Sequence, residues 1–265
     1  MNPLSRLVPA LALLVGLAAC TTTPTNVELQ LRQPVVLLGE VHDNEAQHAL
    51  RLRAFETLLA SGARPALALE QFDRNHQPAI DQALARTPRP DADELIAAAA
   101  GAKGWQWQHY RPFITLALQY GLPIVAANVP SAEARTVMRD GLAAAGFRTD
   151  VPEALMQAQA SAIVGSHCGL VGEATARRMA LAQVARDQFM AQVLQENAAR
   201  GVVLLAGNGH VRTDVGVPHW LDAATRQRSE AIGVLEEGDD ERAFDRWVLT
   251  PTQARPDPCE AMRKK

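Results

Sequence analysis

The fold is predicted most directly by one stretch, Pro34-Val35-Val36-Leu37-Leu38-Gly39-Glu40, in which an apolar run ends at a glycine and a carboxylate. Three later apolar runs also end in polar or glycine-rich turns: Pro65-Ala66-Leu67-Ala68-Leu69-Glu70, Leu122-Pro123-Ile124-Val125-Ala126-Ala127-Asn128 and Val202-Val203-Leu204-Leu205-Ala206-Gly207-Asn208. Runs that are almost continuously apolar are typical of strands buried on both faces of a parallel sheet. We therefore expect four parallel strands, each ending in polar residues.

The segments between these strands have helical patterns. We expect helices over 44–60, with Asp43 or Asn44 as N-cap, over 110–119 and over 173–199, and two shorter helices within 78–100. Alternating strands and helices predict an α/β fold with a mostly parallel central sheet flanked by helices. Residues 131–200 are expected to form a helical cap inserted before the fourth strand. Two later runs, 231–235 and 243–249, suggest a hairpin at one edge of the sheet.

The N-terminus has the pattern of an exported protein. Arg6 precedes an apolar run of about 13 residues, which fits a secretory signal and is shorter than the roughly 20 residues that span a bilayer. The run ends in Leu17-Ala18-Ala19-Cys20, which resembles the lipobox of bacterial lipoproteins. That resemblance implies cleavage before Cys20 and acylation of its sulfur, with palmitate as a typical acyl group. No aspartate follows Cys20, which implies a lipid-anchored location at the outer membrane facing the periplasm.

The expected organisation is a signal peptide over 1–19, a tether over 20–33, an α/β domain over 34–250 and a C-terminal tail over 251–265. The chain has 26 Lys+Arg against 29 Asp+Glu. This balance argues against nucleic-acid binding, which needs a clustered basic surface. If Cys20 is acylated, Cys168 and Cys259 remain, either joined as a disulfide or as two free thiols.

Polar side chains stand where each predicted strand ends. Glu40 and His42 follow the first strand, Glu70 ends the second, Asn128 ends the third, and His210 follows the fourth. Open parallel sheets bind ligands beyond the carboxyl ends of their strands, so we expect these side chains on one rim. Histidine and glutamate suit either a divalent metal such as zinc or acid–base chemistry. His42, His210 and Glu70 are therefore candidate metal ligands, and with Glu40 they are candidate catalytic residues.

Longer motifs make the rim more specific. The stretches 39–44 with His48, 68–74, 107–112, 123–130, 206–210 and 216–218 closely resemble the ChaN family of haem-binding lipoproteins, and the similarity covers roughly residues 34–220. The family lies in a wider superfamily with erythromycin esterases and Tiki-type proteases, which is marked by two Gly-x-x-His motifs and an acidic residue. Gly39–His42, Gly207–His210 and Glu70 fit that mark.

The resemblance implies a membrane-anchored protein that binds haem for iron or haem uptake, with a tyrosine as axial ligand and haems paired across a homodimer. Tyr110 lies in a matching segment and is a candidate ligand, although a buried aromatic with a satisfied hydroxyl is an equal alternative. His167 and the methionines Met179 and Met190 are other candidate ligands, and the methionines are more typical of core positions.

Further haem contacts are expected from polar residues near the rim, namely Arg111, Asn128 and Asn208. Arginine suits the propionate groups of haem, so Arg74, Arg111 and Arg212 are candidates, with solvated surface charges as the default interpretation. His48 and His76 are expected at the surface or in support of the site.

A second hypothesis from another class is a metal-dependent hydrolase, an esterase or peptidase. In it, His42 or His210 acts as general base or binds the metal, and Glu40 or Glu70 completes the site. The sequence contains no Gly-x-Ser-x-Gly motif, so a covalent serine mechanism is not expected.

Overall fold

A computed structural model describes residues 28–99 and 104–263 of the chain. The expected signal peptide, Cys20 and the first part of the tether, through residue 27, lie outside the described residues. Within the described ranges, no helix combines the length and apolar character that crossing a membrane requires.

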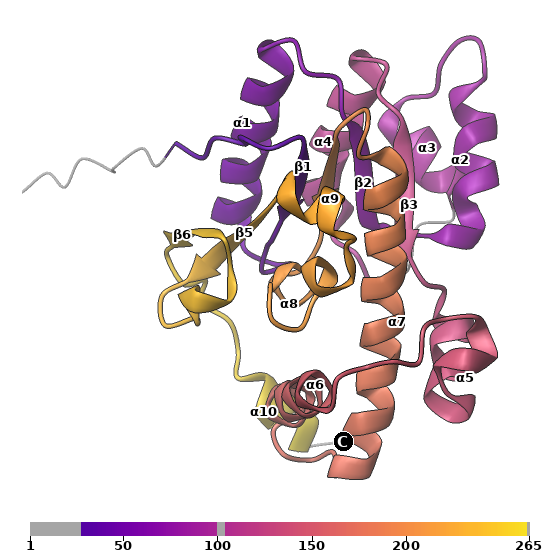
Figure 1. Cartoon of the computed structure of the whole chain (residues 1–265). Coiled ribbons are helices and arrows are strands. Elements are labelled where there is room, and N and C mark those ends of the chain that lie inside the picture. Colours follow the sequence, from indigo (N-terminus) through magenta and orange to yellow (C-terminus); the bar gives the residue numbers. More distant parts are fainter. Residues whose placement is uncertain (1–27, 100–103, 264–265) are drawn as a thin grey trace, which may run out of the picture.

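Six parallel strands form a single sheet in the order β3-β2-β4-β1-β5-β6 (Figure 1). The strands are β1 (Val35–Leu38), β2 (Ala66–Asp73), β3 (Ile124–Asn128), β4 (Val202–Leu205), β5 (Ser229–Glu236) and β6 (Arg246–Thr250). The four strands expected from apolar runs are confirmed, and so is the α/β class. β1 lies between β4 and β5, so the stretch that begins with Val35 is at the centre of the sheet.

The predicted hairpin at the edge is wrong, because β5 and β6 run parallel. In a hairpin, the second strand would begin beside the end of the first. Here Asp245, directly before β6, is fixed beside Ala231 near the start of β5. The Asp245 amide donates to the Ala231 carbonyl at 3.0 Å, and the Asp245 carboxylate accepts from the Ala231 amide at 2.9 Å. Residues 237–245, with the short helix η4 (Glu241–Ala243), carry the chain back.

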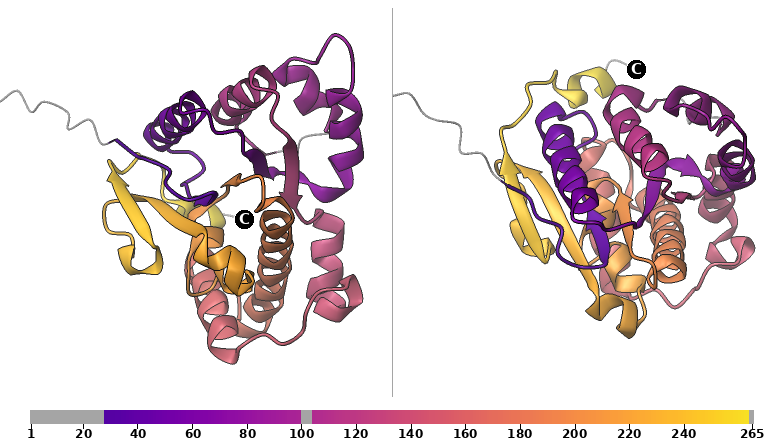
Figure 2. Two further views of the ribbon diagram at one scale, coloured as in Figure 1. Left: turned by 45° about the horizontal axis from the view of Figure 1, so that its top comes forward. Right: turned by 90° about the horizontal axis from the view of Figure 1, so that it is seen from above.

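Helices cover both faces of the sheet (Figures 1 and 2). One face packs against α1 (Glu45–Ala60), α2 (Gln77–Leu84), α3 (Ala92–Ala98) and α4 (Trp107–Gln119). The other packs against α7 (Glu173–Asn197), and α5 (Ser131–Asp140) and α6 (Glu153–Ser166) pack in turn against α7. Leu38 faces the first group and Leu37 the second. Burial on both faces explains why the strand sequences are apolar throughout.

The helix predictions are confirmed to within a few residues. Asn44 is the N-cap of α1, because its side chain accepts from the Gln47 amide. The shorter elements are η1 (Arg74–His76), η2 (Leu142–Ala145), α8 (Asn208–Val211), η3 (Val217–Trp220), α9 (Ala223–Gln227) and α10 (Pro258–Arg263).

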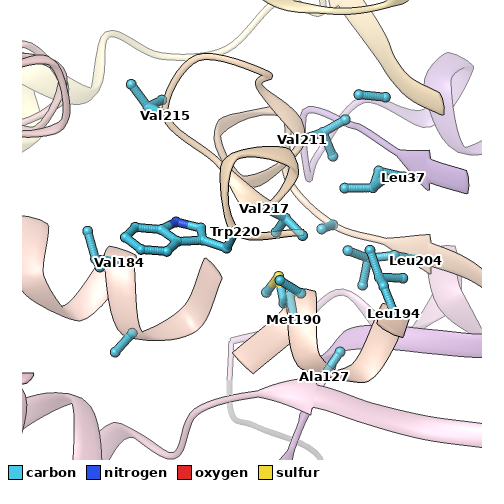
Figure 3. Close-up of a cluster of buried hydrophobic side chains, with 14 of the residues drawn as sticks. Leu37, Ala127, Val184, Met190, Leu194, Leu204, Val211, Val215, Val217 and Trp220 are labelled. Atoms are coloured by element: carbon cyan, nitrogen blue, oxygen red, sulfur yellow. The ribbon is translucent and has the colours of Figure 1, made fainter. Parts of the chain in front are cut away.

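The inserted segment 131–200 is helical as expected, but it is more than a cap. Helix α7 contacts β2, β3 and β4 of the sheet as well as α5 and α6. Figure 3 shows Met190 and Leu194 of α7 close to Leu204 of β4. One part of α7 therefore covers a face of the sheet, while α6 lies beyond the carboxyl ends of the strands (Figure 1).

The C-terminal tail is tied to the cap. Cys168, directly after α6, forms a disulfide with Cys259 in α10, with their Cα atoms 5.6 Å apart. Of the two alternatives for these cysteines, the structure therefore has the disulfide. Arg255 in the same tail pairs with Asp43 at 2.7 Å and with Glu236 at 2.8 Å. The tail thus connects the loop after β1 with the end of α6.

Candidate functional site

Two acid–histidine pairs meet at the carboxyl ends of the central strands. Glu40 and His42 follow β1, and Glu70 of β2 lies near His210 of α8. The pairs meet at Gly207: a Cβ atom there would lie 3.0 Å from Cε1 of His42 and 3.8 Å from Oε2 of Glu70. The expected rim of Glu40, His42, Glu70 and His210 is therefore assembled as adjacent pairs.

Glu40 is a buried carboxylate that holds several neighbours at once. It forms an ion pair with the fully buried Arg51, and the hydroxyl of Tyr110 donates to it. Its Oε1 lies 2.8 Å from Nδ1 of His42, and its Oε2 lies 3.5 Å from Nδ1 of His48. Burial lowers the pKa of Arg51 to about 10, so the guanidinium stays charged at neutral pH. A buried carboxylate needs such a partner.

His42 is the accessible member of the first pair. Its side chain is 48% exposed, and Trp105 lies against its ring edge with the centroids 4.8 Å apart. Burial lowers the pKa of His42 more than the charge of Glu70 raises it, which favours neutral imidazole at pH 7. If Nδ1 carries the proton and donates it to Glu40, the lone pair lies on Nε2. Among residues 28–99 and 104–263, none hydrogen-bonds to that Nε2.

His210 is held differently from His42. Its Nδ1 lies 2.5 Å from Oδ1 of the fully buried Asp187, and its Nε2 lies 3.5 Å from Oε1 of Glu70. Burial alone would lower the pKa of His210, but the charges of Asp187 and Glu70 outweigh it and raise that pKa to about 10. His210 is therefore a cation enclosed by two carboxylates.

The carboxylate of Glu70 is fixed by the same contacts. The Gly207 amide donates to its Oε2 at 2.8 Å. Burial would raise the pKa of Glu70, but the charge of His210 and these hydrogen bonds lower it to about 2. Glu70 therefore stays ionised at neutral pH.

The expected metal site is not supported. The described part of the chain contains no group of three or more His, Cys, Asp or Glu side chains placed to hold a metal ion. The physical reason lies in the contacts of two of the three residues proposed. Both ring nitrogens of His210 are used by carboxylates, and Oε2 of Glu70 accepts from the Gly207 amide. Zinc bound by His42, His210 and Glu70 is therefore set aside.

A cleft of about 400 Å³ opens beside His42. This volume lies within the range of small-molecule sites. The residues that line it come from the loops after β1 and before α4, from the last residues of β2 and β3, and from the segment 129–131 and α7. They are His42, Asp43, Asp73, Gly104, Trp105, Gln106, Asn128, Val129, Ser131 and Arg186. The cleft therefore offers one imidazole, one indole, one guanidinium and the carboxylates of Asp43 and Asp73 in a wall that is part polar and part apolar.

Tyr110 does not reach this cleft. It is fully buried, its hydroxyl donates to Glu40, and burial raises its pKa well above the usual value of 10. The structure thus shows the alternative interpretation, a buried aromatic with a satisfied hydroxyl. A haem iron has no access to this oxygen in the arrangement described.

The other predicted haem contacts are dispersed. Arg111 pairs with Asp93 on the surface, His167 at the end of α6 bonds to the Ile163 carbonyl, and the Asn208 amide donates to the Val234 carbonyl. Asn128 does line the cleft, although its Oδ1 accepts from the Val129 amide. Met190 is buried in the core and Met179 is partly buried against it.

The remaining sequence candidates are paired or structural. Arg74 forms an ion pair with Glu133, and Arg212 pairs with Asp214. His48 supports the site, since its Nε2 bonds to the His42 carbonyl at 2.9 Å. His76 lies in η1, away from the pairs.

The sequence prediction missed Arg51, Asp187, Trp105 and Arg186. Two of these had a signal: a charged residue at a helix position with apolar residues three or four positions away. Asp187 lies between the buried residues Val184 and Ala191 of α7, and Arg51 precedes the buried Phe55 by four positions. A charge at such a position is buried and needs a partner. Trp105 and Arg186 carried no comparable signal.

Comparison with known proteins gives a consistent result. The family model described as haem-binding uptake, Tiki superfamily, ChaN matches residues 28–221. The structure is similar to that of ChaN of Campylobacter jejuni, described for cofacial haem binding, with 22% identity, coverage of 80% of this chain and 86% of that one, and a TM-score of 0.69. An erythromycin esterase in its open conformation matches with 14% identity, 78% and 71% coverage and a TM-score of 0.45. No curated protein matches the sequence.

Proposed function

We propose that this protein binds haem for iron or haem uptake, because the chain belongs to the ChaN family of haem-binding uptake proteins in the Tiki superfamily. The observation within the structure that carries the proposal is the half-exposed imidazole of His42, oriented by the buried Glu40 and facing a cleft.

His42 has the features of an axial ligand of haem iron. Histidine is a common axial ligand, and ligating histidines usually donate their second ring N–H to a carboxylate or carbonyl. Glu40 fills that role at 2.8 Å. The lowered pKa of His42 favours the neutral form, which is the form that binds iron. We therefore place the iron at Nε2 of His42, in preference to the buried Tyr110.

The cleft supplies two further groups that suit haem. Trp105 offers an aromatic surface beside His42, and Arg186 offers a guanidinium for a propionate. An open cleft leaves part of a flat ligand uncovered. We therefore extend the proposal to a homodimer in which a second copy covers it, in line with the cofacial binding described for the Campylobacter protein.

The proposal includes an anchor. The lipobox pattern ending at Cys20 supports acylation of that residue and attachment to the outer membrane on its periplasmic side. Mass measurement of the membrane-extracted protein tests this: a mature chain starting at Cys20 with added acyl mass is expected, and an unmodified chain would contradict it.

Haem binding is tested by titrating haem into a soluble form of the protein, in which Cys20→Ser removes the site of acylation. A saturable Soret band is expected for the wild-type sequence, and its loss for His42→Ala. His219→Ala is the matched control, because His219 is exposed outside the cleft. If no saturable band forms, haem binding is refuted. If Tyr110→Phe abolishes the band while His42→Ala keeps it, the choice of ligand is wrong.

The same geometry favours one second candidate, a metal-independent hydrolase. A neutral histidine held by a carboxylate, with a free Nε2 in a cleft, can act as general base on water. A panel of ester and peptide substrates tests this candidate: turnover that is lost in His42→Ala would support it, and no turnover on any substrate would remove it.

A further inference from the structure

We propose that the outer edge of the sheet, strand β6 with the exposed side chains of Trp247 and Leu249, is the face that this domain lays against a zwitterionic lipid bilayer. The inference rests on the proposed anchoring through Cys20, and it assigns the orientation that the anchored domain takes.

The edge strand presents apolar side chains to solvent. β6 pairs with β5 on one side and ends the sheet on the other. Val248 points into the core, whereas Trp247 is 45% and Leu249 is 43% exposed. Residues two apart on a strand share a face, so these two side chains form one apolar strip. Soluble proteins usually protect an edge of this kind. Tryptophan is enriched where proteins meet the membrane interface.

The described N-terminal segment lies beside this same strand. Leu29 and Leu31 belong to the hydrophobic cluster that includes Val248, and Nη1 of Arg246 donates to the Gln30 carbonyl at 2.9 Å. Figures 1 and 2 show the chain entering the domain on the β5–β6 side. The chain therefore joins the folded domain at the edge strand that carries the apolar strip. It does so on the side of β6 that bears Arg246 and Val248, and Trp247 and Leu249 lie on the other side of the same strand.

The tether is short enough to keep the domain close to the membrane. Between Cys20 and Glu28 there are eight residue steps, which span at most about 28 Å when fully extended. A lipid on Cys20 therefore keeps the edge of β6 close to the bilayer, so that weak contacts of Trp247 and Leu249 form at a high effective concentration.

Charge decides the type of lipid. The loop before β6 carries Glu237, Asp239, Asp240 and Glu241 against Arg242, which pairs with Asp240. The loop is therefore net negative, and anionic headgroups would repel it. The strip therefore fits a zwitterionic surface such as phosphatidylcholine better than an anionic one.

A vesicle experiment tests the contact directly. Cys168 and Cys259 are paired, so Cys20 is the free thiol of the mature chain and can be coupled to a maleimide lipid. The vesicles are phosphatidylcholine with brominated acyl chains, which quench an indole that contacts them. We expect quenching in the wild-type chain, and its loss in Trp247→Phe. Trp107→Phe is the matched control, because Trp107 is partly buried and stacked on the buried Phe72, away from β6. Its removal should leave the quenching unchanged.

Two results would overturn the proposal. One is a wild-type chain that is not quenched, or that is quenched equally after Trp247→Phe. The other combines two observations. The coupled wild-type chain is not quenched on vesicles, and a soluble Cys20→Ser chain forms dimers that dissociate when Trp247→Glu is added. The edge would then bind a second copy of the chain. Chemical coupling makes the test independent of acylation in cells and of haem binding. A failure of this proposal can therefore be distinguished from a failure of the proposed function.

Discussion

Nδ1 of His42 lies 2.8 Å from Oε1 of Glu40, and the other oxygen of that carboxylate is ion-paired with the fully buried Arg51. The exposed imidazole is thus connected to a charge pair inside the protein. Glu40 and Arg51, both within nine positions of His42, therefore set the orientation of the proposed iron ligand.

The first prediction concerns pH. Haem binding through His42 requires neutral imidazole, and burial lowers the pKa of His42 below its ordinary 6.5. Affinity should stay constant from alkaline pH down to about 6.5 and fall only at lower pH, as the ring gains a proton. Soret titrations across this range measure the effect. A loss of affinity centred above pH 6.5 would contradict it.

The second prediction separates two glycines of one motif. A Cβ on Gly207 would lie 3.0–3.1 Å from the ring of His42, whereas a Cβ on Gly209 meets no atom within 4 Å. Gly207→Ala should displace His42 and weaken haem binding about tenfold or more, the scale of about 1.4 kcal/mol. Gly209→Ala should bind as the wild type does. Equal affinities in the two variants would show that Gly207 does not limit the position of His42.

The third prediction concerns stability. Removing one partner of a buried ion pair leaves an uncompensated charge, so Arg51→Met should lower the free energy of unfolding by about 3–5 kcal/mol. Arg53→Met, on the exposed side of the same helix, should change it by about 0.5 kcal/mol or less. Urea unfolding measures both. The double variant Arg51→Met with Glu40→Gln should recover part of the loss, and a loss as large as in the single variant would argue against the ion pair as the cause.

The fourth prediction concerns alkaline stability. The folded pKa of His210 is about 10, above its ordinary 6.5, because of Asp187 and Glu70. Between pH 6.5 and pH 10, the folded state keeps the proton on His210 and the unfolded state loses it. The stabilisation by the charged His210 is therefore complete below pH 6.5 and disappears as pH rises towards 10. Unfolding should therefore become easier from pH 7 to 10 in the wild type, and much less so in His210→Gln. The exposed His219→Gln variant should follow the wild type.

The fifth prediction concerns the disulfide between Cys168 and Cys259. Cys259→Ser should lower the free energy of unfolding by about 2–5 kcal/mol, because the cross-link restricts the unfolded chain. Cys20→Ser, in the tether, is the control and should leave the unfolding curve unchanged. The same curve for both variants would show that the tail adds little to the stability of the domain.

The sequence by itself determined the four strands β1 to β4 and the edge at which their polar ends meet. Val35–Leu38 and Val202–Leu205 are apolar at every position because both faces are covered, and that pattern is local. Glu40, His42, Glu70 and His210 meet because the carboxyl ends of parallel strands share one edge. The Asn44 cap was also predictable, since an N-cap depends on a few neighbouring residues.

Only the tertiary structure decided which residues pair with the side chains at that edge. Asp187 reaches His210 from the middle of α7, and Arg51 reaches Glu40 from α1. The burial of Tyr110 and its hydrogen bond to Glu40 were decided in the same way. These pairings depend on which faces of distant helices pack together, and a buried charge takes whichever partner that packing brings within reach. The direction of β6 was decided in the same way, by the bonds of Asp245 to Ala231.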